Sequence, residues 1–252
     1  MALESIETFM ANGWLGLAIP DWVILFAIVI AWPISSHFTL KNNPVEKLRQ
    51  DPDARLSAYK YTMIQLWVLA LAILATWFWL MRPLEMLGFQ YQLDLPTIIS
   101  WAVVAGLVLF FARQYYQVTH GDEAKAKLTK ELDDVGEYTQ FLMPRTDQEY
   151  RRSMLVAITA GITEEIIFRG YLIWLFSQFV HPWLAGALSV AVFVFLHRYQ
   201  DRAGLIQVAV FATIATVLFL ASGSLWPVIA LHVLVDMINI TVARHVLQSK
   251  NV

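Results

Sequence analysis

The sequence predicts an all-α, polytopic transmembrane helix bundle of about seven spans. Hydrophobic residues make up 58% of the 252 positions, charged residues make up 15%, and ten residues are Trp. This composition lies outside the range of soluble globular domains. Apolar stretches of the length needed to cross about 30 Å of hydrocarbon as helices recur along the chain. They predict spans near residues 15–34, 61–81, 97–112, 153–180, 183–196, 204–221 and 226–242.

The lengths of three predicted spans leave the count open. Segments 97–112 and 183–196 are shorter than the roughly twenty residues that a spanning helix needs. Segment 153–180 is long and contains Gly161. A re-entrant or a broken segment would change the count to six or eight.

The basic residues predict how the chain is oriented. Short cytoplasmic loops collect Lys and Arg. If the N-terminus lies outside, every Lys and Arg except Arg82 and Arg169 falls in a cytoplasmic segment. We therefore expect an integral, multi-pass protein with its C-terminus in the cytoplasm, in a prokaryotic inner membrane. The net charge of −2 argues against a nucleic-acid partner.

The chain is expected to form one membrane domain with two parts. Residues 1–152 would supply three spans and the cytoplasmic loops, including a solvated helix at 122–132. Residues 153–252 would form the bundle that holds the candidate site. Thr146 and Glu149 have the spacing of a capping box, so a helix should begin there. Rising about 1.5 Å per residue, this helix carries Glu164 about 25 Å along its axis, well into the membrane.

Adjacent carboxylates in the fourth predicted span are the first sign of a functional site. Glu164 and Glu165 stand in an apolar stretch, and ionisable groups persist there mainly when they face a protein interior and carry a function. Glu165 and Arg169 are four residues apart on one helix face and should form an ion pair. Glu164 must then find a partner on another helix or hold its proton, which makes it a candidate general base.

Two later spans each supply a His with an Asp four residues on. If the helices continue, each span places three side chains on one face: Phe193, His197 and Asp201 in the fifth span, and His232, Asp236 and Asn239 in the seventh. Taken singly, each group has a structural explanation as an ion pair or an interhelical hydrogen bond. Three spans that each supply such a polar pair indicate a functional site.

The order and spacing of these motifs resemble the CPBP family, the CAAX protease and bacteriocin-processing enzymes also called Abi proteins. The resemblance covers roughly residues 146–246 and rests on three motifs: Glu164-Glu165-x-x-x-Arg169 with Phe168-Arg169-Gly170 inside it, Phe193-x-x-x-His197, and His232-x-x-x-Asp236. It implies a glutamate-dependent intramembrane endopeptidase that acts on a membrane-associated protein or peptide.

The resemblance also implies roles for the site residues. Glu164 and His197 would activate a water molecule, and His232 with its partner would stabilise the oxyanion. Members of the family often have Asn at the positions of Asp201 and Asp236. An ionised Asp236 would repel an oxyanion, so we expect it either to orient and charge His232 or to stay protonated. Asn239 would offer a neutral donor one turn further on.

Two other interpretations use the same residues. In the first, His197, His232 and a carboxylate bind zinc, although the sequence has no His-Glu-x-x-His motif; otherwise no cofactor is expected. In the second, the protein is not an enzyme. It would be a proton-coupled transporter that uses Glu164 and the histidines as a relay, or a membrane protein of the bacteriocin-immunity type. Matching half-sequences, which many transporters have, are not visible.

Overall fold

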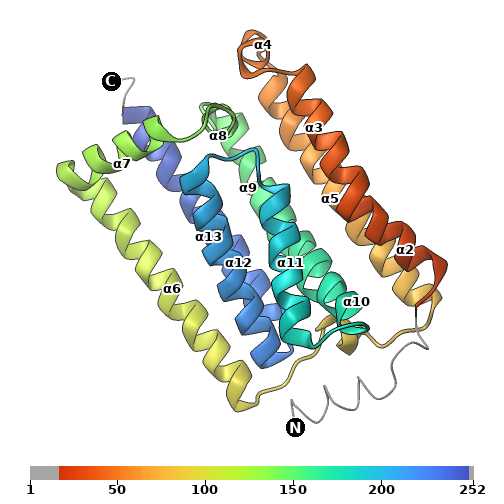
Figure 1. The fold of residues 1–252 in the computed structure, drawn as a ribbon. Helices are drawn as coiled ribbons and strands as arrows, with labels where there is room; N and C mark the ends of the chain where they lie inside the picture. The colour runs from red at the N-terminus through yellow and green to blue at the C-terminus, as the bar shows by residue number, and fades with distance from the viewer. Residues whose placement is uncertain (1–16, 250–252) are drawn as a thin grey trace.

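All the regular secondary structure of the described chain is helical, as predicted. The computed structural model describes residues 17–249, and the ribbon in Figure 1 shows them as a bundle of long, roughly antiparallel helices. The first two residues of the first predicted span, Leu15 and Gly16, lie outside the described residues.

The first half of the chain forms the two outer edges of the bundle. In order, its elements are α2 (Ile19–Phe26), the π-helix η1 (Ala27–Ala31), α3 (Trp32–Asn42), α4 (Val45–Gln50), α5 (Ala54–Trp79), the 3-10 helix η2 (Leu84–Leu87) and α6 (Leu95–His120). The α2–η1–α3 rod runs beside α5 at one edge, and α6 lies at the opposite edge (Figure 1).

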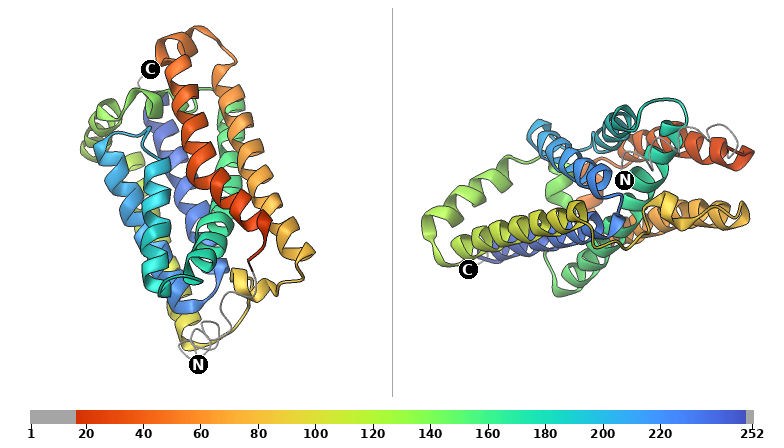
Figure 2. Two further views of the ribbon diagram at one scale, coloured as in Figure 1. Left: turned by 45° about the vertical axis from the view of Figure 1, so that its right-hand side comes forward. Right: turned by 90° about the horizontal axis from the view of Figure 1, so that it is seen from below.

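The second half fills the space between these edges. Its elements are α7 (Asp122–Asp134), α8 (Glu137–Leu142), α9 (Asp147–Glu164), the π-helix η3 (Glu165–Leu172), α10 (Ile173–Ser177), α11 (Pro182–Leu196), α12 (Arg202–Ser222) and α13 (Leu225–Ser249). α9, η3 and α10 follow one another without a break. Figures 1 and 2 show α4, α7 and α8 at one end of the bundle, which we call the α4–α8 end, and α10 at the other.

Each of the seven predicted spans is helical in the structure. Within residues 17–249, five helical stretches are long and apolar enough to cross a membrane: Ile19–Asn42, Ala54–Trp79, Leu95–His120, Arg202–Ser222 and Leu225–Gln248. The other two predicted spans correspond to the more polar α9–η3–α10 rod and to α11, which has only 15 residues. Large apolar side chains on the outer helices, such as Trp79 and Leu109, are exposed, as expected of a surface that faces lipid.

The prediction for residues 97–112 was too short, because α6 continues to His120 and has 26 residues. Its apolar pattern stops at Arg113, but no Gly or Pro follows until Gly121, so the helix continues past the charge. The predicted helix start at Thr146 is confirmed. The Thr146 hydroxyl accepts a hydrogen bond from the Glu149 N–H at 3.2 Å, and the Glu149 carboxylate accepts one from the Thr146 N–H at 2.8 Å.

α9 packs between α5 on one side and α13 on the other. Gly161 permits the close approach of α13, because a Cβ at this position would lie 2.8 Å from the Val233 backbone nitrogen. This close approach brings the carboxyl end of α9 beside the part of α13 that carries His232.

Candidate functional site

A π-helix carries the polar motif of the fourth span. η3 follows α9 directly, and all eight of its residues are buried, because it packs against α5, α11 and α13. π-helical turns are rare and occur frequently at functional sites. Their wider spacing disturbs the usual backbone pairing, and here the Ser189 hydroxyl of α11 donates a 2.6 Å hydrogen bond to the Phe168 carbonyl oxygen. The two neighbouring carboxylates are both buried: Glu164 is 9% exposed and Glu165 is 0% exposed.

Glu165 forms the predicted ion pair with Arg169 and also binds a residue of α13. Its Oε1 lies 2.9 Å from Arg169 Nη1 and 2.6 Å from His232 Nδ1. Arg169 also donates through Nη2 to the Ala212 carbonyl oxygen at 3.2 Å, and its guanidinium lies 4.8 Å from the ring centre of Phe193. Buried charges need this degree of compensation. The hydrogen bond to His232 was not predicted.

His232 is oriented so that its second ring nitrogen faces two further carboxylates. Because a carboxylate oxygen accepts at Nδ1, this nitrogen carries a proton. Nε2 lies 3.9 Å from Glu164 Oε2 and 3.7 Å from Asp236 Oδ2. Both distances are too long for a direct hydrogen bond, but a charged imidazole would interact with both carboxylates. The Phe211 ring, 4.8 Å away between centroids, packs against the imidazole edge-on.

His197 reaches the same region from the end of α11. Its Nδ1 donates to the Phe193 carbonyl oxygen at 2.8 Å, and its ring centre lies 4.4 Å from that of Phe193. The Phe193 ring centre is in turn 6.5 Å from that of His232. Within residues 17–249, His197 forms no direct hydrogen bond with Glu164. With Nδ1 protonated, a neutral His197 has its lone pair on Nε2.

The predicted shared face of Phe193, His197 and Asp201 is wrong at Asp201. The prediction required α11 to continue, but the helix ends at Leu196 and the chain turns. Asp201 instead caps the start of α12, where its Oδ1 accepts a 2.8 Å hydrogen bond from the Gly204 N–H. Asp is favoured at this position because its side chain satisfies a free backbone donor.

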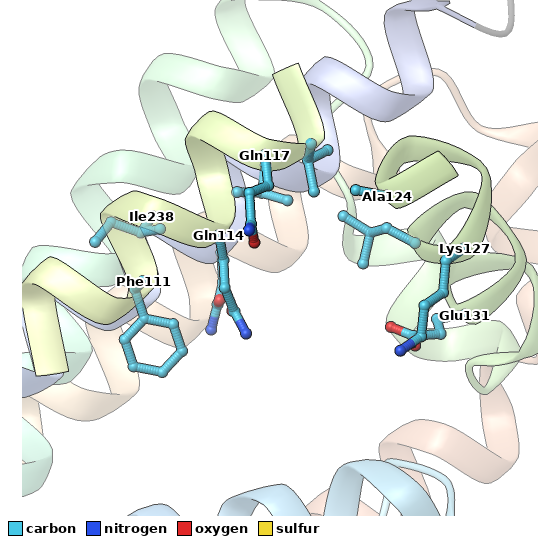
Figure 3. A pocket seen from close by; sticks show the side chains of 11 residues that line it. Phe111, Gln114, Gln117, Ala124, Lys127, Glu131 and Ile238 are labelled. Atoms are coloured by element: carbon cyan, nitrogen blue, oxygen red, sulfur yellow. The ribbon is translucent and has the colours of Figure 1, made fainter. Parts of the chain in front are cut away.

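The predicted stripe on α13 holds for His232 and Asp236 but not for Asn239. Asn239 lies seven residues past His232, about 10.5 Å further along the helix axis. It lines a separate pocket of about 390 Å³ between α6, α7 and α13 (Figure 3). Gln114 and Lys127 line the same pocket, so Asn239 lies outside the cluster around His232.

Tyr199 belongs to the site but was missed in the sequence. Its ring centre lies 5.8 Å from that of His197. The expected continuation of α11 concealed it, because a residue two positions after His197 on a helix would point away. The turn after Leu196 is what brings it in.

The predicted zinc ligands do not form a ready-made metal site. Among the side chains that the structure describes, no group of three or more His, Cys, Asp or Glu has an arrangement that could hold a metal ion.

The fold and the cluster together define a class of protein. It is a helical integral membrane protein in which carboxylates and imidazoles from η3, α9, α13 and the end of α11 lie close together. Residues 148–238 match the family model described as type II CAAX prenyl endopeptidase Rce1-like. The matched range contains Glu164, Glu165, Arg169, His197, His232 and Asp236. This match confirms the resemblance predicted from the three motifs. No curated protein and no solved structure matches the chain.

Proposed function

We propose that the protein is an intramembrane endopeptidase that hydrolyses a peptide bond of a membrane-associated protein or peptide with a water molecule activated by Glu164. The observation that carries this proposal is the difference between two adjacent carboxylates. Glu165 is engaged by Arg169 and His232. Glu164 is also buried, but among the described side chains its carboxylate accepts no hydrogen bond, and its ion-pair contact is the 3.9 Å approach to His232 Nε2. A buried carboxylate without a fixed donor is suited to accept a proton.

In the proposed reaction, the water molecule lies between Glu164 and the scissile carbonyl, and the lone pair of His197 Nε2 helps to hold it. Glu164 takes a proton as the water oxygen attacks the carbonyl carbon. The same proton then passes from Glu164 to the departing amine, so the carboxylate is regenerated. The negative charge that develops on the carbonyl oxygen needs a donor in a water-poor site.

His232 is the proposed donor to this oxyanion, because protonation places an N–H on Nε2. Glu165 acts as a positioning residue, since its hydrogen bond to Nδ1 fixes the ring. Asp236, with Oδ2 3.7 Å from Nε2, favours the charged ring. The phenol of Tyr199 supplies a second donor, which is neutral, in the same region.

We further propose the topology that the basic residues predict. The α4–α8 end would face the cytoplasm of a prokaryotic cell and the N-terminus would lie outside. In this arrangement the helices of residues 17–152 flank the helices of residues 153–249, which carry the site. Cysteine substitution at exposed positions at the two ends, such as Lys60 and Leu95, followed by labelling of intact cells would test this orientation.

The decisive experiment compares Glu164→Gln with wild type by peptidomics of membranes and by cleavage with purified protein. The matched control is Glu123→Gln, which makes the same chemical change at an exposed position of α7. We expect Glu164→Gln to fold normally and to lose at least about 10²-fold in turnover, while the control stays active. Near-normal cleavage by folded Glu164→Gln would contradict the proposal. Wild-type protein that moves a solute or binds a partner while leaving peptides intact would favour the non-enzymatic class.

A further inference from the structure

A polar cavity separate from the candidate site and from the pocket that Asn239 lines lies at the α4–α8 end. It has a volume of about 490 Å³ and is formed where α4, the start of α5 and α8 meet. Its lining includes three arginines, Arg49, Arg55 and Arg145, and one acid, Asp51. None of these residues takes part in the cluster around His232.

One arginine is a fixed part of the fold. Arg55 Nε donates to the Phe141 carbonyl oxygen, and its Nη1 forms an ion pair with Glu149. Glu149 also accepts from the backbone N–H groups of Arg145 and Thr146, both at 2.8 Å. Arg55 is therefore largely neutralised and shapes the wall of the cavity.

The other two arginines have no such partners. Among the described residues, the guanidinium groups of Arg49 and Arg145 form no hydrogen bond or ion pair. Asp51 accepts a hydrogen bond from the Asp53 N–H at 2.9 Å, so its carboxylate is also engaged locally. With Glu149 included, three arginines face two carboxylates, and the cavity has a positive excess with two guanidinium groups available to a ligand.

We propose that this cavity binds a phosphate group through Arg49 and Arg145. The planar guanidinium forms paired, charge-assisted hydrogen bonds with phosphate oxygens, which a single ammonium cannot reproduce. Two such groups on different elements, α4 and the segment between α8 and α9, approach one anion from two sides. The site is independent of the proposed peptidase activity.

The surroundings point to the headgroup of an anionic phospholipid as the source of this phosphate. The cavity lies where α3 and α5, both candidate membrane spans, are joined by α4. Phe38 on α3 and Tyr61 on α5 are large exposed residues. Tyr61 lies less than about two helical turns from Arg55, which lines the cavity, and Phe38 lies in the last turns of α3, which ends at Asn42 before α4. A lipid would place its phosphate on the arginines and its acyl chain along this apolar surface. Basic pockets between spans bind headgroups in the same way.

The test is a titration of the full-length protein in detergent, followed by native mass spectrometry, with phosphatidylglycerol, phosphatidylcholine or inorganic phosphate. The double variant Arg49→Gln/Arg145→Gln removes the two free groups. Its matched control, Arg151→Gln/Arg152→Gln, removes two charges from exposed positions of α9 outside the cavity. Arg55 is left intact because Glu149 depends on it.

We expect the cavity variant to lose about tenfold in affinity for phosphatidylglycerol and the control to lose no more than about twofold. Phosphatidylcholine should bind weakly and equally to all three proteins. Equal losses in both variants, or none in the cavity variant, would overturn the site. Binding of inorganic phosphate that matches phosphatidylglycerol in affinity and in its sensitivity to the cavity variant would support the phosphate site and overturn the lipid as its source.

Discussion

Replacing Glu165 by Met should destabilise the folded protein, because it leaves the buried guanidinium of Arg169 without a compensating negative charge. Arg169 is 1% exposed, and Glu165 is its only carboxylate partner among residues 17–249. Removal of one partner from a buried ion pair costs about 3–5 kcal/mol. The Ala212 carbonyl and the Phe193 ring still contact the guanidinium but carry no full charge.

A second substitution separates stability from activity. In Glu165→Met/Arg169→Met, the unpaired charge is gone and two apolar side chains of similar volume replace the pair. Most of the lost stability should return, since such replacements are often neutral. Cleavage should not return, because His232 has still lost the acceptor of its 2.6 Å hydrogen bond. Glu165→Gln, which keeps an acceptor oxygen, should retain more activity than Glu165→Met.

The assay is a double-mutant cycle of unfolding free energies in detergent, together with peptide cleavage by each folded variant. The reasoning is refuted if Glu165→Met is as stable as wild type to within about 0.5 kcal/mol. It is also refuted if the double variant cleaves as fast as wild type, because Glu165 would then have no part in positioning His232.

Three further outcomes follow from the structure. Gly161→Ala should push α13 away at Val233 and lower the rate of peptide cleavage by about tenfold to a hundredfold. The free energy of unfolding, measured by thermal unfolding, should fall by about 1–3 kcal/mol. An unchanged cleavage rate would contradict the close approach. Burial tends to raise the pKa of Glu149, but the N–H groups and the arginine that bind it hold this pKa below its ordinary value. Glu149 thus stabilises the fold at pH values above the ordinary carboxyl pKa, and this contribution is lost as the pH falls through the lowered pKa. Glu149→Gln should therefore reduce the loss of stability at acidic pH in a curve of unfolding free energy against pH. An acidic part identical to that of wild type would disprove this role of Glu149. Asp236→Asn should cleave more slowly than wild type and Asp236→Ala more slowly still, by about ten- to a hundredfold; full activity in both would remove Asp236 from the mechanism.

The fold was predictable because hydropathy and capping are local properties. The apolar stretches mark the spans, and the pairing of Thr146 with Glu149 determines where α9 begins. The Glu165–Arg169 pair follows from their spacing of four residues. Each of these depends on residues that are close together in the sequence, so no tertiary information was needed.

The site was only partly predictable because its remaining features depend on contacts between helices. The hydrogen bond from His232 to Glu165 joins residues 67 positions apart. The hydrogen bond from the Ser189 hydroxyl to the Phe168 carbonyl oxygen of η3 joins residues 21 positions apart. The end of α11 at Leu196 was hidden by an apparently helical spacing, and this error misplaced Asp201 and concealed Tyr199.

The shortness of α11 affects how a polar chain could reach the bundle interior. Its 15 residues rise only about 22 Å, less than the hydrocarbon thickness of about 30 Å. If one end of α11 lies at the membrane surface, the other end stops several ångströms below the opposite surface, and the open peptide groups of the following turn must be solvated by protein or water at that depth. The apolar layer that a polar group must cross is therefore thinner above this turn than elsewhere. An extended, hydrated peptide would then have to shed only part of its water to approach Glu164, instead of crossing the full apolar layer.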